Sequence, residues 1–178
     1  TNVTEDITVT AEFAINTYTV TFIDWDEQVI DTQKVEYGKG ATAPEDPARA
    51  GYTFTGWDVT FDNVTSDLTV KATYSINTYT VTFNVGGGSE VAAQTVEHGG
   101  KATEPKAPIK EGYTFAGWYA DEGFTTAFNF DTEITADTTI YAKWEINTYA
   151  VTYTAGENGT ITGETTQTVK HGENGTAV

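Results

Sequence analysis

Cysteine and methionine are absent from the 178 residues of this sequence, and basic side chains are scarce. Without cysteine, neither disulfide bonds nor a cysteine-ligated zinc ion can stabilise the fold, so stability has to come from the packing of apolar side chains. The 26 Asp and Glu residues far outnumber the 9 Lys and Arg residues and give a formal charge of −17. Because phosphate binding requires clustered cations, we expect no nucleic-acid partner.

Long hydrophobic runs are lacking as well. No stretch approaches the ~20 apolar residues of a membrane-spanning helix, and no basic and then apolar leader opens the chain. We therefore predict no membrane insertion of this segment. Because methionine is absent, we expect the segment to be cut from a longer protein, in which a signal peptide or a wall anchor could lie elsewhere.

The residues that are present favour strands. Thr, Val, Tyr, Phe and Ile dominate the runs between Gly and Asn clusters, and β-branched and aromatic residues of this kind are enriched in sheets. In one such run, Tyr18, Val20 and Phe22 fall on one face and the threonines on the other, which is the alternation of a half-buried strand. We predict a mostly β protein of small modules, since about 60 residues is close to the smallest unit that folds without disulfides or metals.

The order of motifs repeats along the chain. The segment Ile15–Phe22 returns unchanged at Ile76–Phe83 and in similar form at Ile146–Tyr153. Gly51–Trp57 recurs as Gly112–Trp118 in the same order. The predicted closing strands are Ile7–Phe13, Leu68–Tyr74 and Thr138–Trp144. Self-similarity of this kind predicts a tandem array of modules.

The repeats set the predicted domain boundaries. Residues 1–15 would be the closing strand of a truncated repeat, 16–76 and 77–146 complete repeats, and 147–178 the opening hairpin of another truncated repeat. Residues 119–130 replace a shorter stretch after Trp57 and are predicted to form a loop insertion. Each crossover carries two prolines, such as Pro44 and Pro47, which exclude a long helix and leave room for one helical turn.

Aromatic residues are the candidates for ligand contact. Strand alternation places Tyr52 and Phe54 on one face and Trp57 on the opposite face, and Gly56 indicates a bulge or a close backbone approach. An exposed tryptophan could stack on a sugar ring, although a tryptophan that recurs once per unit beside glycine favours packing in the core. The possible ligand contacts are Trp57, Trp118, Tyr119 and Phe124.

Several ordered motifs together resemble a known family. They are Tyr79–Phe83, Val96–Gly99, the proline-rich crossover Glu104–Lys110, Glu111–Tyr119 and Thr138–Trp144. This set resembles the Listeria-Bacteroides repeat, also called the internalin-type B repeat. The unit at 77–146 matches along its whole length, whereas the unit at 16–76 departs by its shorter loop and by Tyr37 in place of histidine.

The resemblance implies a small α+β module of β-grasp-like fold with a compact mixed sheet. It also implies secretion to an extracellular location at a bacterial cell surface or cell wall, often of Gram-positive bacteria. Members of the family serve as spacers that hold an adhesive domain away from the wall, and some are suspected of contacting host components.

Catalytic equipment is missing from the motifs. His98 and His171 occupy the same hairpin position as Tyr37, an exchange that a catalytic or metal-binding role would not survive. No nucleophile elbow is present, and the glycine-rich stretch Asn84–Ser89 joins two strands, which predicts a flexible hairpin tip and not a phosphate site. We expect no enzymatic activity, no catalytic residue, no cofactor and no metal site.

Two cation-dependent or covalent features remain open at this stage. Four carboxylates could supply calcium ligands, but their spacing matches no known loop and alternation spreads them over both faces. They are Asp24, Asp26, Glu27 and Asp31. An isopeptide cross-link needs a buried lysine, and Lys71 and Lys143 are expected on the solvent face of their strands. The sequence decides neither question.

The junction between units indicates a mechanical role. Closing and opening strands are joined by Ile-Asn-Thr without glycine, proline or a serine-rich stretch, so we expect a stiff connection and a rod that lengthens with repeat number. The predicted function is a spacer or stalk that presents an adhesive domain, with neighbouring repeats as its partners in the chain. The alternative is a module that binds a host-surface protein or glycan through exposed aromatics and the variable loop Asp121–Phe130.

Overall fold

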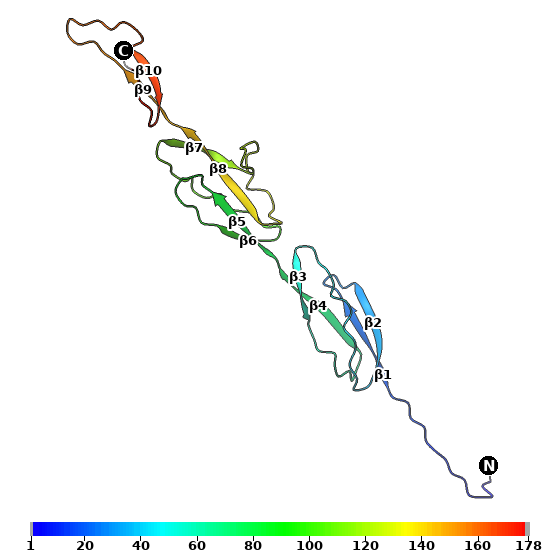
Figure 1. The fold of residues 1–178 in the computed structure, drawn as a ribbon. Coiled ribbons are helices and arrows are strands. Elements are labelled where there is room, and N and C mark those ends of the chain that lie inside the picture. The colour runs from blue at the N-terminus through cyan, green and yellow to red at the C-terminus, as the bar shows by residue number, and fades with distance from the viewer. Residues whose placement is uncertain (1, 177–178) are drawn as a thin grey trace. The chain divides into compact units, whose positions relative to one another are not determined.

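The computed structural model describes residues 2–176, in which all regular secondary structure is β. The chain divides into two compact units, Thr1–Ile76 and Asn77–Val178. Figure 1 shows a four-stranded sheet in each unit and a hairpin at the end of the second. The predicted mostly β class is confirmed. Among residues 2–176, no helix is long and apolar enough to cross a lipid bilayer.

The first unit is built on one mixed sheet. Its strands are β1 (Thr17–Ile23), β2 (Val29–Glu36), β3 (Tyr52–Trp57) and β4 (Leu68–Ile76), in the order β2-β1-β4-β3. The central pair β1 and β4 is parallel, while β1 with β2 and β3 with β4 are antiparallel. A parallel pair cannot be joined by a tight turn, so the chain crosses over between β2 and β3 through the proline-bearing segment.

The second unit repeats this topology. Its sheet consists of β5 (Thr78–Asn84), β6 (Gln94–Glu97), β7 (Tyr113–Tyr119) and β8 (Thr138–Ile146), in the order β6-β5-β8-β7. The parallel pair is again central, formed by β5 and β8. The antiparallel hairpin of β9 (Thr148–Thr152) and β10 (Thr166–Lys170) follows in the same unit. The predicted repeat boundaries at 16, 77 and 147 fall close to the starts of β1, β5 and β9, and they stay a prediction.

The predicted alternation along the opening strand is confirmed. Val20 and Phe22 of β1 have no exposed surface, and Val70 of the neighbouring strand β4 has none either. Hydrophobic burial on one face of a sheet stabilises by roughly 1.5–3 kcal/mol for each large side chain, so these few residues carry most of the module's stability. The equivalent buried residues of the second repeat are Val81, Phe83, Ile140 and Ala142.

A bulge at the end of β3 overturns one expectation about Trp57. The register of β3 against β4 shifts between Phe54 and Gly56, and Gly56 has a φ of 127°. One extra residue on the bulged strand reverses the alternation that follows it. Trp57 therefore lies on the same face as Phe54, with the two rings 5.4 Å apart, and the prediction that it faces the opposite side was wrong.

A glutamine clamps the start of each crossover. Gln33 of β2 donates its side-chain N–H to the Thr42 carbonyl and accepts the Thr42 N–H at 2.6 and 2.9 Å. Gln94 holds Thr103 in the same way at 2.7 and 2.8 Å. The two bonds satisfy the backbone N–H and the backbone carbonyl of one threonine. They thereby fix the direction in which the chain leaves the hairpin.

One expected strand is not present in the described residues, and the helical turn for which the prolines left room is not formed in them. Neither crossover contains a helical turn, since the segments 43–50 and 104–110 run without helical hydrogen bonding between their prolines. Residues 7–13, whose sequence resembles a closing strand, form no strand and are exposed. A closing strand needs a parallel neighbour such as β1 and an antiparallel neighbour such as β3, and residues 7–13 pair with neither.

Candidate functional site

The two tryptophans of the repeated aromatic motif lie in different surroundings. Trp118 is buried, with 4% of its surface exposed. Its ring centroid lies 5.1 Å from that of Phe83 and 5.2 Å from that of Phe115. Trp57 is only partly buried and contacts Phe22 at 5.0 Å. Both rings pack against other aromatic residues, as the favoured interpretation expects. A role of either tryptophan in ligand contact stays a prediction, and Trp57 is the more exposed of the two.

The inserted loop brings the other two predicted residues together. The rings of Tyr119 and Phe124 meet edge to face, with centroids 5.8 Å apart, and Lys143 of β8 lies 4.9 Å from the Tyr119 centroid. Phe124 is 37% exposed and has a φ of 53°, a conformation that costs an L-residue energy. The loop therefore displays an aromatic pair beside a cation, an arrangement that suits stacking on a planar or apolar ligand.

Asp121 fixes the conformation of this loop. Its carboxylate accepts hydrogen bonds from the backbone N–H groups of Thr125 at 3.1 Å and Thr126 at 2.9 Å. Its backbone carbonyl also accepts the N–H of Phe124 at 3.0 Å. The bonds from Thr125 and Thr126 favour the charged carboxylate, so they lower the pKa of Asp121 below its ordinary value.

We expect the loop to loosen in acid. Because the folded-state pKa of Asp121 lies below the ordinary value of 3.8, its stabilising contribution is present above that value and is lost as pH falls through the folded pKa. In NMR titrations, the amide protons of Thr125 and Thr126 should shift together with an apparent pKa below 3.8. Asp121→Asn, which keeps the shape without the titrating charge, should remove the transition. A midpoint at or above the ordinary value would contradict the assignment.

A cation between aromatic rings was not predicted from the sequence. The Arg49 guanidinium lies 3.6 Å from the Tyr52 centroid and 4.3 Å from the Trp25 centroid. The Tyr74 ring lies in the same cluster, and its hydroxyl donates a hydrogen bond to the Asp24 carboxylate. Burial is the larger cause and this bond the second, and together they raise the pKa of Tyr74 to about 12. In the second repeat, Lys110 takes this place over Tyr113 and Trp144. The signal was a cation two residues before Gly-Tyr in both repeats.

The glycine-rich stretch after β5 is packed against the module. Trp144 donates its indole N–H to the Val85 carbonyl at 2.9 Å, and Lys110 donates to the Gly86 carbonyl at 2.7 Å. A Cβ at Gly88 would come within 2.6 Å of the Trp144 ring. The expected flexible hairpin tip is therefore a closely held turn, in which glycine permits the approach of a large ring.

Three of the acidic residues considered for calcium accept hydrogen bonds from nearby backbone N–H groups. Asp24 accepts the N–H of Trp25, Asp26 that of Gln28, and Asp31 that of Thr32. In the described part of the chain, no group of three or more His, Asp or Glu side chains gathers as a metal site would require. Lys71 lies 3.6 Å from Glu27 in an exposed ion pair. Each of these side chains thus has a partner within the first repeat.

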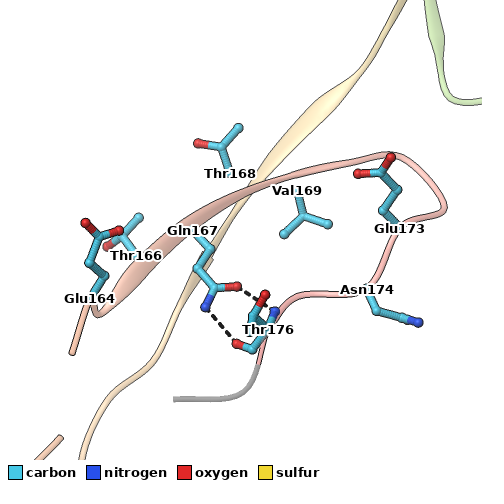
Figure 2. A pocket seen from close by; sticks show the side chains of 8 residues that line it. All are labelled: Glu164, Thr166, Gln167, Thr168, Val169, Glu173, Asn174 and Thr176. Carbon is cyan, nitrogen blue, oxygen red and sulfur yellow. Dashed lines mark hydrogen bonds between the residues drawn. The ribbon is translucent and has the colours of Figure 1, made fainter. Parts of the chain in front are cut away.

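A hollow of about 510 Å³ beside the last hairpin has a structural origin. Figure 2 shows Gln167 of β10 bonded twice to Thr176, and these bonds measure 2.7 Å each. They repeat the glutamine clamp of the two complete sheets. The lining is mainly polar and includes Glu164 and Glu173. We assign the hollow to the open side of the hairpin.

The junction between the second sheet and this hairpin lies inside one compact unit. Asn147, between β8 and β9, donates its backbone N–H to the Gly112 carbonyl at 2.8 Å. Its side-chain oxygen accepts the Thr114 hydroxyl at 2.6 Å, and its carbonyl accepts the N–H of His171 at 2.8 Å. Asn147 therefore connects the hairpin to the sheet through its backbone and its side chain.

The His171 ring lies directly against Gly112. Gly112 has a φ of 75°, and a Cβ at this position would come within 1.9 Å of His171 Cδ2. Only glycine suits both the backbone conformation and the close contact. Tyr37 and His98 hold the equivalent position after their hairpins. The backbone N–H of Tyr37 donates to the Asn16 carbonyl, and that of His98 donates to the Asn77 carbonyl. The structural role predicted for the two histidines agrees with these contacts.

A family model described as the Listeria-Bacteroides repeat domain matches residues 18–77 and 79–143, which correspond to the two complete sheets. The chain belongs to this family. Listeria-Bacteroides repeats are non-catalytic modules found in surface proteins such as internalins.

Individual relatives are long proteins. A suspected membrane protein of Evansella cellulosilytica is 39% identical over 85% of this chain, which covers 24% of that protein. A second, glycine-rich suspected membrane protein of the same organism is 38% identical over 84% of the chain and 19% of its own length. Internalin H of Listeria monocytogenes is 36% identical over 58% of the chain and 21% of its own length. The chain thus spans about a quarter or less of these relatives.

Proposed function

We propose that this chain is a non-catalytic spacer segment of an extracellular bacterial surface protein, which holds an adhesive domain away from the cell wall. The observation that carries the proposal is the junction at Asn147. Its three hydrogen bonds and the contact between His171 and Gly112 restrain the connection between the second sheet and the hairpin that follows it. A stalk needs such restraint, because a flexible linker would let successive modules fold back on one another.

The same residue types recur at the preceding boundary of the sequence, as Gly51, Thr53, Asn77 and His98. A spacer built from tandem units requires each boundary to carry the same sequence, whereas the loops between strands are free to vary. Residues 58–63 and 119–133 differ in length and composition, and this contrast supports a role that depends on the boundaries.

The test is small-angle X-ray scattering from arrays of two and four complete repeats. A spacer predicts a maximum dimension that rises in proportion to repeat number. Inserting two glycines after each junction asparagine, such as Asn147, should shorten the mean dimension and broaden its distribution. Exchanging the exposed residues 122–126 for a glycine-free stretch of equal length is the matched control and should leave the dimension unchanged, because Asp121 and the core-packed Phe128 and Phe130 are kept. Compact particles from the unmodified arrays would contradict the proposal.

A second candidate function is binding to a host-surface protein or glycan through the inserted loop. The exposed Phe124 beside Tyr119 and Lys143 favours it. Under this alternative, Phe124→Ala would abolish adhesion to host cells, and the glycine insertions at the junctions would leave adhesion unchanged. The glycine insertions at the junctions and the changes in the inserted loop therefore separate the two candidates, because each candidate depends on only one of these regions.

A further inference from the structure

The first repeat has an apolar groove beside Trp57, and this place corresponds to the part of the second repeat that carries the inserted loop. The groove measures about 440 Å³ and lies beside Trp57 at the end of β3. Its lining includes Gly40, Ala41, Trp57, Val59, Phe61 and Asp62. Val59 is 40% exposed although it is apolar. An open hollow of this composition exposes hydrophobic surface to water, which is the general signature of a binding surface.

The inserted loop of the second repeat fills the corresponding place. Residues 127 and 128 run beside the end of β7, where Ala127 forms a β-bridge with Tyr119 and Phe128 donates its N–H to the Trp118 carbonyl at 2.8 Å. The Phe128 ring packs against the core and lies 4.9 Å from the Phe130 ring. Trp118 belongs to this core and has 4% of its surface exposed.

The first repeat lacks an equivalent of Phe128. The short connection 58–63 supplies Phe61, whose ring contacts Phe22 at 5.1 Å, but no further aromatic residue over Trp57. β3 is the outer strand of its sheet, as β7 is in the second. The second repeat therefore displays the kind of occupant that suits this place, an extended segment along the outer strand with one phenylalanine in the groove.

The charge of the groove selects among such segments. Asp62 lines it, while the lining residues that the structure describes include no cation. The whole chain carries a formal charge of −17. Complementary charge speeds association and disfavours acidic competitors, so a basic segment is the matching partner.

We propose that the groove beside Trp57 binds an extended, basic peptide segment of a partner protein. One phenylalanine of the segment occupies the groove, and its backbone adds to the end of β3 as residues 127–128 add to β7. Adding a strand at a sheet edge combines backbone hydrogen bonds, which supply affinity, with a side-chain pocket, which supplies specificity. This site is separate from the junctions and does not depend on the spacer role.

The probe is a synthetic peptide with the sequence of residues 125–129 between added lysines, titrated into the isotope-labelled whole chain. Amide signals of residues 40–41 and 57–62 should shift, and those around Trp118 should not. A peptide with alanine in place of its phenylalanine should bind about tenfold more weakly or worse, since one buried aromatic ring is lost. Glutamate in place of the added lysines should also weaken binding.

Three variants make the test independent of folding defects. Val59→Asp should prevent binding, whereas Val29→Asp, at another exposed valine of the same repeat, should bind like the unmodified chain. Replacing residues 58–63 with residues 119–133 should close the groove and abolish the shifts while Trp57 is kept. The proposal is overturned if the lysine-flanked peptide causes no shifts, if the alanine peptide binds equally well, or if the grafted chain still binds. Shifts of the same amides by a neutral oligosaccharide, without any by the peptide, would assign the groove to glycans instead.

Discussion

Phe22→Ala is expected to unfold the first repeat while the second stays folded. Phe22 has no exposed surface, and its ring contacts both Trp57 and Phe61. Removing a buried phenylalanine costs about 3–5 kcal/mol, because the transfer free energy of the ring is lost and a cavity remains. A module of this size is stabilised by only a few kcal/mol, about 3–5 by its core. The loss is therefore comparable with the whole stability of the repeat.

The measurement is amide hydrogen exchange resolved by repeat. In Phe22→Ala, protection should be lost in β1 to β4 and retained in β5 to β8. Phe83→Ala is the reciprocal variant, at a residue with 6% exposure in the other core, and should show the opposite pattern. Val29→Ala, at an exposed side chain, should change the free energy of unfolding by less than about 0.5 kcal/mol. Simultaneous loss of both sheets in either core variant would show that the two cores fold as one.

Gly112→Ala is expected to detach the hairpin of β9 and β10 from the second repeat. The new Cβ would collide with the His171 ring, and the φ of 75° would be strained by about 1–2 kcal/mol. An isolated two-stranded hairpin is marginally stable in water, so a hairpin that loses its contact with the sheet should also lose its strands. Amide protection should disappear from Thr148–Thr152 and Thr166–Lys170 and persist in β5 to β8.

Two comparisons separate the collision from the backbone strain. Gly99 has a φ of 77°, and a Cβ there meets no atom within 4 Å, so Gly99→Ala reports the strain alone. His171→Ala combined with Gly112→Ala should cost less than the sum of the single variants, because the ring that the new Cβ would strike is absent. Additive costs would show that the contact between His171 and Gly112 does not hold the hairpin.

Predictions from the sequence were correct where a structural feature depends on residues that are neighbours in the chain. Alternation of apolar and threonine residues placed Val20 and Phe22 in the core, because successive side chains of a strand point to opposite faces. The recurrence of Ile-Asn-Thr-Tyr marked the start of each opening strand. Glycine before the motif tryptophan indicated a bulge, which the structure contains. The same bulge places Trp57 on the face opposite to the predicted one. A prediction from alternation assumes that every residue of the strand is paired in turn, and the exact position of the extra, bulged residue is not apparent from the sequence.

By itself, the sequence determined the β class, the tandem repetition and the family, since each depends on the order of residues along the chain. Tertiary structure decided which tryptophan is buried, because Trp57 and Trp118 have the same local sequence context and differ in what distant residues cover them. Phe128 packs against the core that contains Trp118, whereas a groove lies beside Trp57 at the shorter connection 58–63. The contact of His171 with Gly112 was likewise decided in three dimensions, because it joins residues that are close only once the strands between them have paired.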